Sequence, residues 1–348
     1  MRPRRYSVPA IIAALTFFHA AAAHLCSAQP LTFATDEPGG VRALVEQGEQ
    51  RGTGAAPAAD QPTPRTDRNS LIAHAQLLEK ARQGRIDVYF AGDSITRRWG
   101  TSDEQYKAFL ANWRQNFFGW NAANFGWGGD TTQNILWRLG NGELDNVNPK
   151  IIVLLAGTNN VGNKSPQGTE DPRVADITRG IKAILEMCRR KAPGATIVLM
   201  GITPRNDNMA VMPIINRIND NIAKFADGKK IRYLNINDRL ADKDGKLFEG
   251  MTTRDGLHLD VKGYQVWADA LKPIFNELLG PPAREDHAPP PTGDPSAANR
   301  PRASYLQSLG TSVRHYLKGD GLKLGRTRAD HDVEHARLDD AFHVLVQE

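Results

Sequence analysis

The sequence predicts an α/β fold in which a five-stranded parallel sheet lies between two layers of helices. Short apolar runs rich in β-forming residues alternate with longer helical patterns from about residue 70 to residue 279. One of these runs, 151–156, is apolar at every position, as is typical of a strand buried on both faces. This alternation predicts a three-layer α/β/α sandwich, and such a sheet binds its ligands at the carboxyl ends of its strands.

Each element is predicted from its local pattern. Ser70 is expected to cap the first helix, and the last helix carries one continuous apolar face. The predicted strands are 86–91, 122–125, 151–156, 196–201 and 231–236. The predicted helices are 70–81, 103–116, 131–139, 175–191, 212–226 and 262–279. Glycine-rich or polar motifs follow the first four strands, so we expect these motifs to meet along one edge of the sheet.

The composition is that of an ordinary globular protein. Of the 348 residues, 40% are hydrophobic and 24% are charged, and the formal net charge is +5. The basic residues form no long run, so no nucleic-acid partner is expected. The oligomeric state stays open.

Residues 1–28 have the pattern of a secretory signal peptide. Three arginines precede an apolar stretch over 10–23, and small residues precede Gln29, where cleavage is expected. This predicts a secreted or periplasmic protein with no stable membrane anchor after cleavage. The alternative is an uncleaved anchor or a buried N-terminal helix. Cys26 would leave with the signal, and Cys188 would remain as a small buried hydrophobe in a helix.

The composition changes on both sides of the predicted domain. Residues 29–68 lack periodicity and are expected to be a flexible N-terminal segment. The folded domain is expected to span 69–280, and a proline-rich linker is expected over 281–299. Residues 300–348 are expected to form a disordered or weakly helical tail. The histidines beyond 280 match no metal-binding spacing, so no metal site is expected.

Ser94 and His258 are the candidate nucleophile and general base. Ser94 follows the first predicted strand directly, and Asp255 lies three residues before His258. A serine becomes nucleophilic when an imidazole takes its proton, and the imidazole needs a carboxylate that holds its tautomer. His74, the other histidine within 69–280, has no acid at this spacing. The alternative role for Ser94 is that of a helix-capping serine.

Gly129 and Asn159 are the candidate donors of an oxyanion hole, together with the backbone N–H of Ser94. They follow the second and third predicted strands. A glycine lets a backbone N–H approach a ligand closely, and an asparagine amide donates without adding charge. The alternative is that both positions serve only as turn or cap residues.

At this point the sequence resembles a known family, the SGNH (GDSL-type) esterases and lipases, and within it the platelet-activating-factor acetylhydrolase Ib type. The resemblance covers roughly residues 70–279. The matching stretches are 91–95 (AGDSI), 124–130 (NFGWGGD), 135–139 (ILWRL), 157–160 (GTNN) and 255–259 (DGLHL).

The resemblance implies a flavodoxin-like arrangement of the sheet and a role for each matching residue. Ser94 would be the nucleophile, Asp255 the acid and His258 the base. Gly129, Asn159 and the N–H of Ser94 would form the oxyanion hole. The family needs no cofactor.

The sequence defines the substrate less sharply than the reaction. We expect a hydrolase that removes acetyl groups from O-acetylated carbohydrate, so the expected partner is a small molecule or polysaccharide that carries an ester. The alternative substrate is a short-acyl phospholipid or lysophospholipid. An alternative of another class is a catalytically inert binding protein. Trp99, Trp127 and Trp267 either line the site, as flat aromatic faces do for sugars, or belong to the core. The candidate pocket residues are Asp93, Trp99, Trp127, Asn160 and Leu257.

Overall fold

The computed structural model describes residues 56–168 and 170–298. Within them five strands form one sheet in the order β2-β1-β3-β4-β5, and all neighbours are parallel. This is the flavodoxin-like order, so the predicted fold class is confirmed. The strands are β1 (Val88–Gly92), β2 (Ala122–Asn124), β3 (Ile151–Leu155), β4 (Thr196–Met200) and β5 (Ile231–Leu234).

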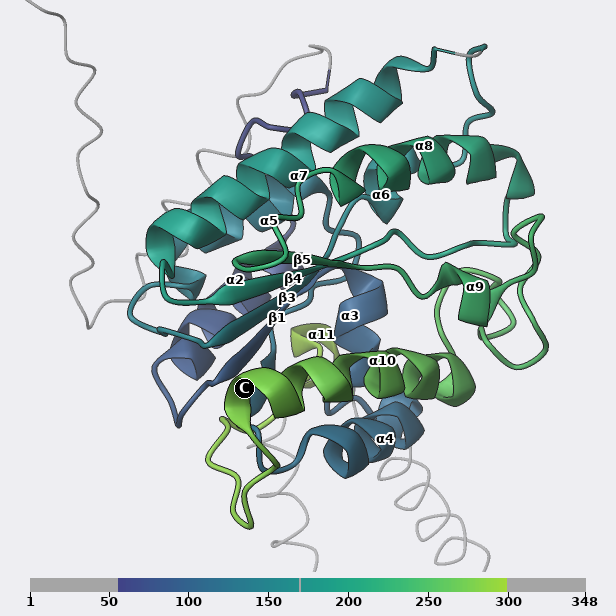
Figure 1. Ribbon diagram of the computed structural model, residues 1–348. Coiled ribbons are helices and arrows are strands. Elements are labelled where there is room, and N and C mark those ends of the chain that lie inside the picture. Colours follow the sequence, from purple (N-terminus) through teal and green to yellow (C-terminus); the bar gives the residue numbers. More distant parts are fainter. Residues whose placement is uncertain (1–55, 169, 299–348) are drawn as a thin grey trace, which may run out of the picture.

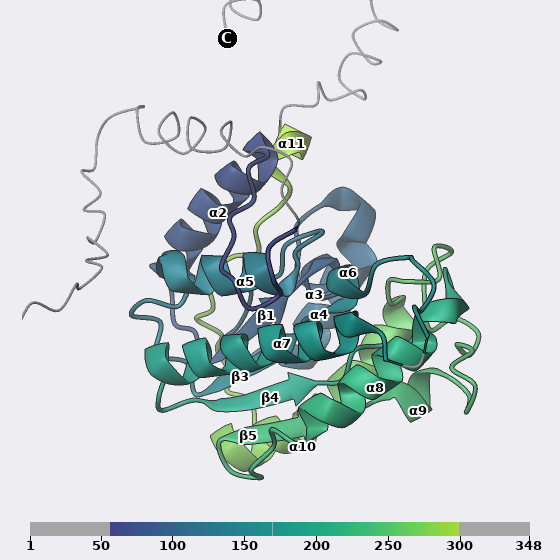
Figure 2. The same ribbon diagram turned by 90° about the horizontal axis from the view of Figure 1, so that it is seen from above.

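Helices cover both faces of the sheet (Figure 1). One face carries α2 (Arg68–Ala81), α5 (Thr132–Arg138), α7 (Pro172–Lys191) and α8 (Met212–Ala223). The other carries α3 (Ser94–Trp99), α4 (Lys107–Phe117) and α10 (Val261–Leu279). Figure 2 shows α5, α7 and α8 side by side above the strands. Successive strand residues alternate between the two cores, which explains why the strands are apolar throughout.

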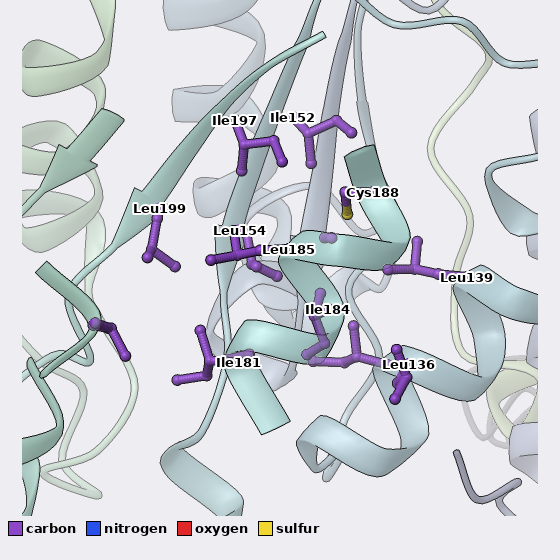
Figure 3. Close-up of a cluster of buried hydrophobic side chains, with 14 of the residues drawn as sticks. Leu136, Leu139, Ile152, Leu154, Ile181, Ile184, Leu185, Cys188, Ile197 and Leu199 are labelled. Atoms are coloured by element: carbon purple, nitrogen blue, oxygen red, sulfur yellow. The ribbon is translucent and has the colours of Figure 1, made fainter. Parts of the chain in front are cut away.

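Aliphatic side chains fill the core beneath α7 (Figure 3). Ile181, Ile184 and Leu185 pack against Ile152 and Leu154 of the central strand. The helix starts well because Asp171 accepts the N–H of Arg173 and Pro172 occupies the first turn. Cys188 is fully buried in this core, as its place in the helical pattern predicted.

The opposite core is aromatic, and it corrects one expectation about the site. Trp99 and Trp267 are completely or almost completely buried, with 0% and 1% of their surface exposed, so neither tryptophan lines a substrate pocket. The ring of Trp99 stacks on Tyr264, and its indole N–H donates to Asn112. Large aromatic rings stabilise such a core strongly, because each buries about 150–250 Å² of surface.

Several short elements were not predicted, because one or two turns carry no periodic signal. They are η2 (Leu139–Glu143), α6 (Thr158–Val161), η3 (Met209–Val211), α9 (Asn237–Leu240) and α11 (Pro295–Ala298). α3 was missed for the same reason. The predicted helix 103–116 is divided into a short 3₁₀ turn, η1 (Glu104–Tyr106), and α4. The cap of α2 is Asp67 rather than Ser70, because the Asp67 carboxylate accepts the N–H of Ser70.

The expected flexible segment ends earlier than predicted, because residues 57–67 pack on the domain. Ala59 is fully buried, and its carbonyl accepts the hydroxyl of Thr132. A Cβ on Gly180 would lie only 2.6 Å from that carbonyl, so the chain and α7 meet closely there. The prediction of flexibility up to residue 68 is therefore wrong for this part.

The proline-rich segment is also more ordered than a linker. The carbonyl of His287 accepts the N–H of Arg85, and the carbonyl of Thr292 accepts the N–H of Ser102. The N–H of Ala283 donates to Gly119. These bonds tie 281–298 to loops around β1 and β2, so this part of the predicted linker belongs to the domain.

The remaining boundary predictions lie outside the described residues. These are the signal peptide, residues 29–55 and the tail beyond 298. In the part of the chain that the structure describes, no helix is long and apolar enough to cross a membrane.

Candidate active site

The candidate nucleophile lies at the carboxyl edge of the sheet, where parallel strands place their ligands. Ser94 begins α3 directly after β1, and its side chain is half-buried. Asp93 caps this helix, because its Oδ1 accepts the N–H of Ile95. His258 lies on the loop before α10, and only 8% of its surface is exposed.

Three side chains that are far apart in the sequence form one hydrogen-bonded chain. His258 Nε2 lies 2.8 Å from Ser94 Oγ, and His258 Nδ1 lies 2.8 Å from Asp255 Oδ2. A carboxylate can only accept, so Nδ1 carries the proton and Nε2 presents its lone pair to the serine hydroxyl. This is the arrangement that lets an imidazole take the serine proton.

Asp255 is fixed by donors from its own loop. Its Oδ1 accepts the backbone N–H groups of Leu257 and His258 and the hydroxyl of Thr253. Burial works against the charge of the carboxylate, but these bonds and the His258 ring outweigh it and hold the pKa of Asp255 well below its usual range. The carboxylate therefore stays ionised at any pH at which His258 titrates.

The imidazole is kept neutral by its surroundings. Burial, and after it the charge of Arg98, lower the pKa of His258, and the carboxylates of Asp255 and Asp207 offset this only in part. A general base must be unprotonated to accept a proton. His258 is therefore ready to act at neutral pH and somewhat below it.

The loop after β2 brings the candidate oxyanion donors together. Gly129 has a φ of 79°, a left-handed conformation that favours glycine. Asn159 Nδ2 donates to the carbonyl of Asp130 at 2.8 Å, so α6 and this loop are joined next to Gly129. The amide of Asn159 has a second N–H for a ligand. Gly129 thus lies in a turn, as the alternative interpretation proposed.

The sequence analysis missed Arg65, which lies over the same loop. Its Nη1 donates to the carbonyl of Gly128 at 3.0 Å and lies 3.5 Å from Asp130 Oδ1. A Cβ on Gly129 would come within 3.1 Å of this guanidinium. Because 29–68 was expected to be flexible, nothing in the pattern placed Arg65 near the site.

A buried charge network supports the loop and was also missed. Arg138 Nε donates to Asp130 Oδ2 at 2.7 Å, and its Nη1 pairs with Glu143. His74 Nδ1 lies 2.8 Å from Glu143 Oε1, so His74 serves the network and not the nucleophile. Arg138 also reaches the carbonyl of Gly92, two residues before Ser94. Arg138 is part of the matching stretch 135–139, which was the one available signal.

Arg138→Leu should destabilise the protein by about 3–5 kcal/mol, because it removes the buried guanidinium that pairs with the carboxylates of both Asp130 and Glu143. Urea unfolding monitored by circular dichroism measures this change. Arg179→Leu is the matched control, because Arg179 is 55% exposed and pairs with Asp176 on the same helix surface. Equal shifts of the unfolding midpoint in the two variants would contradict a structural role for the network.

The structure also corrects the list of candidate pocket residues. Asp93 is fully buried beneath the nucleophile, and burial raises its pKa to about 7. Trp127 is 7% exposed and directs its indole N–H to Ser70 Oγ on α2. The guanidinium of Arg97 lies 4.8 Å from the Trp127 ring centroid. Asp93 is therefore closed off from a substrate. Trp127 borders a small pocket with Arg97 and Thr101, and the lining of that pocket includes neither Ser94 nor His258.

The two remaining pocket candidates are half-buried. Asn160 accepts the N–H of Thr132 and donates to Gln133, which ties α6 to α5. Leu257 uses its N–H to hold Asp255. Among residues 56–168 and 170–298, no group of three or more His, Cys, Asp or Glu side chains is arranged to hold a metal ion.

Comparison with known proteins agrees with this geometry. The family model of the GDSL-like lipase/acylhydrolase family matches residues 90–266, which include all of the serine, aspartate and histidine chain. The chain belongs to this family. It is a carboxylic ester hydrolase, and the resemblance stated from the motifs is confirmed.

Individual relatives match the chain beyond the residues of the family model. The chain is 31% identical over 243 residues to platelet-activating factor acetylhydrolase IB subunit alpha1 of Bos taurus, which covers 68% of this chain and 97% of that protein. The human alpha1 subunit is 32% identical over 227 residues, with 64% and 90% covered. A GDSL-like lipase from Bacteroides thetaiotaomicron aligns with a TM-score of 0.47 and 20% identity, over 60% of this chain and 98% of that chain.

Proposed function

We propose that this GDSL hydrolase cleaves short-acyl esters, acetyl esters first, through an acyl-enzyme formed on Ser94. The observation that carries the proposal is the continuous chain from Ser94 Oγ through His258 to Asp255, with 2.8 Å at both links. The nucleophile, its base and the group that orients the base are therefore present in one place.

The reaction proceeds in two halves. His258 Nε2 takes the Ser94 proton while Oγ attacks the ester carbonyl, and the N–H groups of Ser94 and Gly129 and the Asn159 amide hold the oxyanion. The imidazolium then protonates the alcohol, which leaves as the C–O bond breaks. Water, deprotonated by His258, attacks the acyl-enzyme and releases the acid and Ser94. Each oxyanion donor is worth about 3 kcal/mol in comparable sites.

The acyl group is proposed to be acetyl because relatives that share 90% or more of their length with this chain are named acetylhydrolases. Their names favour a short-acyl phospholipid as the substrate. The predicted signal peptide favours O-acetylated carbohydrate outside the cell. The tryptophans no longer support the carbohydrate, because Trp99, Trp127 and Trp267 all lie within the fold.

A hydrolysis panel tests the proposal. It contains p-nitrophenyl acetate, butyrate, hexanoate and octanoate, acetylated xylan, acetylated sialic acid and a 2-acetyl phospholipid. We expect the highest kcat/KM with acetyl esters. A steady rise to octanoate would contradict it, since an open apolar groove gains about 0.8 kcal/mol for each CH₂. No hydrolysis, together with no fluorophosphonate labelling of Ser94, would favour an inert binding protein.

A further inference from the structure

Arg98 lies next to the proposed triad but takes no part in the mechanism above. It stands four residues after Ser94 on α3, so the two side chains lie on the same face of the helix. Its Nη1 is 3.1 Å from Asp255 Oδ2. The same oxygen accepts the Nδ1–H of His258 at 2.8 Å. One carboxylate oxygen therefore faces both the guanidinium and the imidazole.

The other contacts of Asp255 explain why it matters that Arg98 and His258 share the oxygen Oδ2. Its Oδ1 is occupied by the N–H groups of Leu257 and His258 and by the Thr253 hydroxyl. Only Oδ2 is left to bind the imidazole, and Arg98 contacts that oxygen. The guanidinium carbon of Arg98 lies 5.2 Å from the ring centroid of Tyr106, and 21% of the side chain is exposed. Arg98 is thus held from two sides.

We propose that Arg98 is a positioning residue of the triad, which fixes Asp255 Oδ2 for His258 and extends the activity of the base to lower pH. The inference rests on the proposed function. The geometric part of the role needs the planar guanidinium, whereas the electrostatic part needs only a positive charge.

The electrostatic part has a definite sign. The charged groups that face His258 are Arg98 from α3, Asp255 from its own loop and Asp207 from the loop after β4. Asp207 is itself paired with Arg205. Arg98 is the cation among the three, and a cation disfavours the imidazolium. Removal of its charge therefore raises the pKa of His258, and more of the base is protonated in acid.

Arg98→Met tests both parts in the full chain. With p-nitrophenyl acetate, we expect the acidic limb of kcat/KM to move up by roughly 0.5–1 pH unit. On the alkaline plateau we expect kcat to fall about 10–100-fold, because the carboxylate is less well oriented, while KM changes less than about twofold. Arg98→Lys keeps the charge, so its acidic limb should stay close to that of the wild type, although its plateau kcat should fall.

Arg254→Met is the matched control. Arg254 is exposed beside Asp255, and its side chain forms no hydrogen bond or ion pair within the described part of the chain. The control removes one positive charge from the loop that carries Asp255. It should leave both the acidic limb and the plateau of the pH profile unchanged. Circular dichroism and thermal melting establish that each variant is folded. If Arg98→Met fails to fold, Arg98→Lys still tests the geometric part through its plateau kcat.

Four results would overturn the inference. The first is an unchanged acidic limb and plateau in Arg98→Met, and the second is an equal shift of the limb in Arg254→Met. The third is a plateau kcat in Arg98→Lys equal to that of the wild type. The fourth is a change in Arg98→Met confined to KM, which would indicate a role in substrate binding. Fluorophosphonate labelling separates this failure from that of the proposed function. A wild-type protein that labels at Ser94 and hydrolyses the ester keeps the function, whatever the Arg98 variants do.

Discussion

Ser94→Ala should lower kcat on p-nitrophenyl acetate by at least about 10⁴-fold while the fold is retained. Loss of the serine removes the atom that forms the acyl-enzyme, and in a comparable hydrolase this costs on the order of 10⁶ in kcat. The fold should survive, because the hydrogen bond that caps α3 comes from Asp93 and not from Ser94. Stopped assays at high enzyme concentration and circular dichroism measure the two quantities.

Ser102→Ala is the matched control for this change. Ser102 is exposed and lies eight residues further along the chain, and its backbone N–H, which the substitution keeps, makes the contact to Thr292. The Ser102→Ala variant should hydrolyse the ester at the rate of the wild type. Fluorophosphonate should label the Ser102→Ala variant but not the Ser94→Ala variant. A Ser94→Ala enzyme that keeps more than about a hundredth of the wild-type rate would disprove the assignment.

His258→Ala should be nearly as damaging to the rate as the serine change, whereas His74→Ala should change the rate by less than about tenfold. His258 is the proposed acceptor of the serine proton, and no other histidine in the described residues contacts Ser94. Rate measurements at several pH values compare the two variants. The wild-type rate should rise with pH through the pKa of His258, which lies below its ordinary value.

His74→Ala should lower the stability of the protein more than His258→Ala does, although it affects the rate less. Removal of His74 leaves a buried carboxylate oxygen of Glu143 without its partner, so we expect a loss of about 1–3 kcal/mol in the free energy of unfolding. His74 is only 8% exposed, so its contact with Glu143 is shielded from water. Comparable rate losses in two folded variants would contradict the assignment of the base.

The sheet and most helices were predictable because their signals are local. β3 is a continuous apolar run, and α7 and α10 carry apolar faces with a helical period. The nucleophile was predictable for a related reason. Parallel strands bring their carboxyl ends to one edge, so Ser94 after β1 and Asn159 after β3 had to lie close together. Asp255 and His258 could be paired because they are three residues apart.

The orientation of individual side chains could not be predicted in this way. Trp99 was a pocket candidate because flat aromatic faces bind sugars, but the helical turn of α3 directs its ring into the aromatic core. The buried network was hidden for a similar reason. His74 and Glu143 are 69 residues apart, and nothing in either local pattern shows that a folded core brings them to 2.8 Å.

The sequence by itself determined the parallel sheet, and it predicted the edge at which the candidate site lies and the candidate residues Ser94, Asp255 and His258, because periodicity and short spacings are properties of the chain. Only the tertiary structure decided the charges around that site. Arg98 and Asp255 are 157 positions apart, and Arg65 and Gly128 are 63 apart. An ion pair depends on distances of a few ångström between side chains, and these distances are set by the packing of the whole domain.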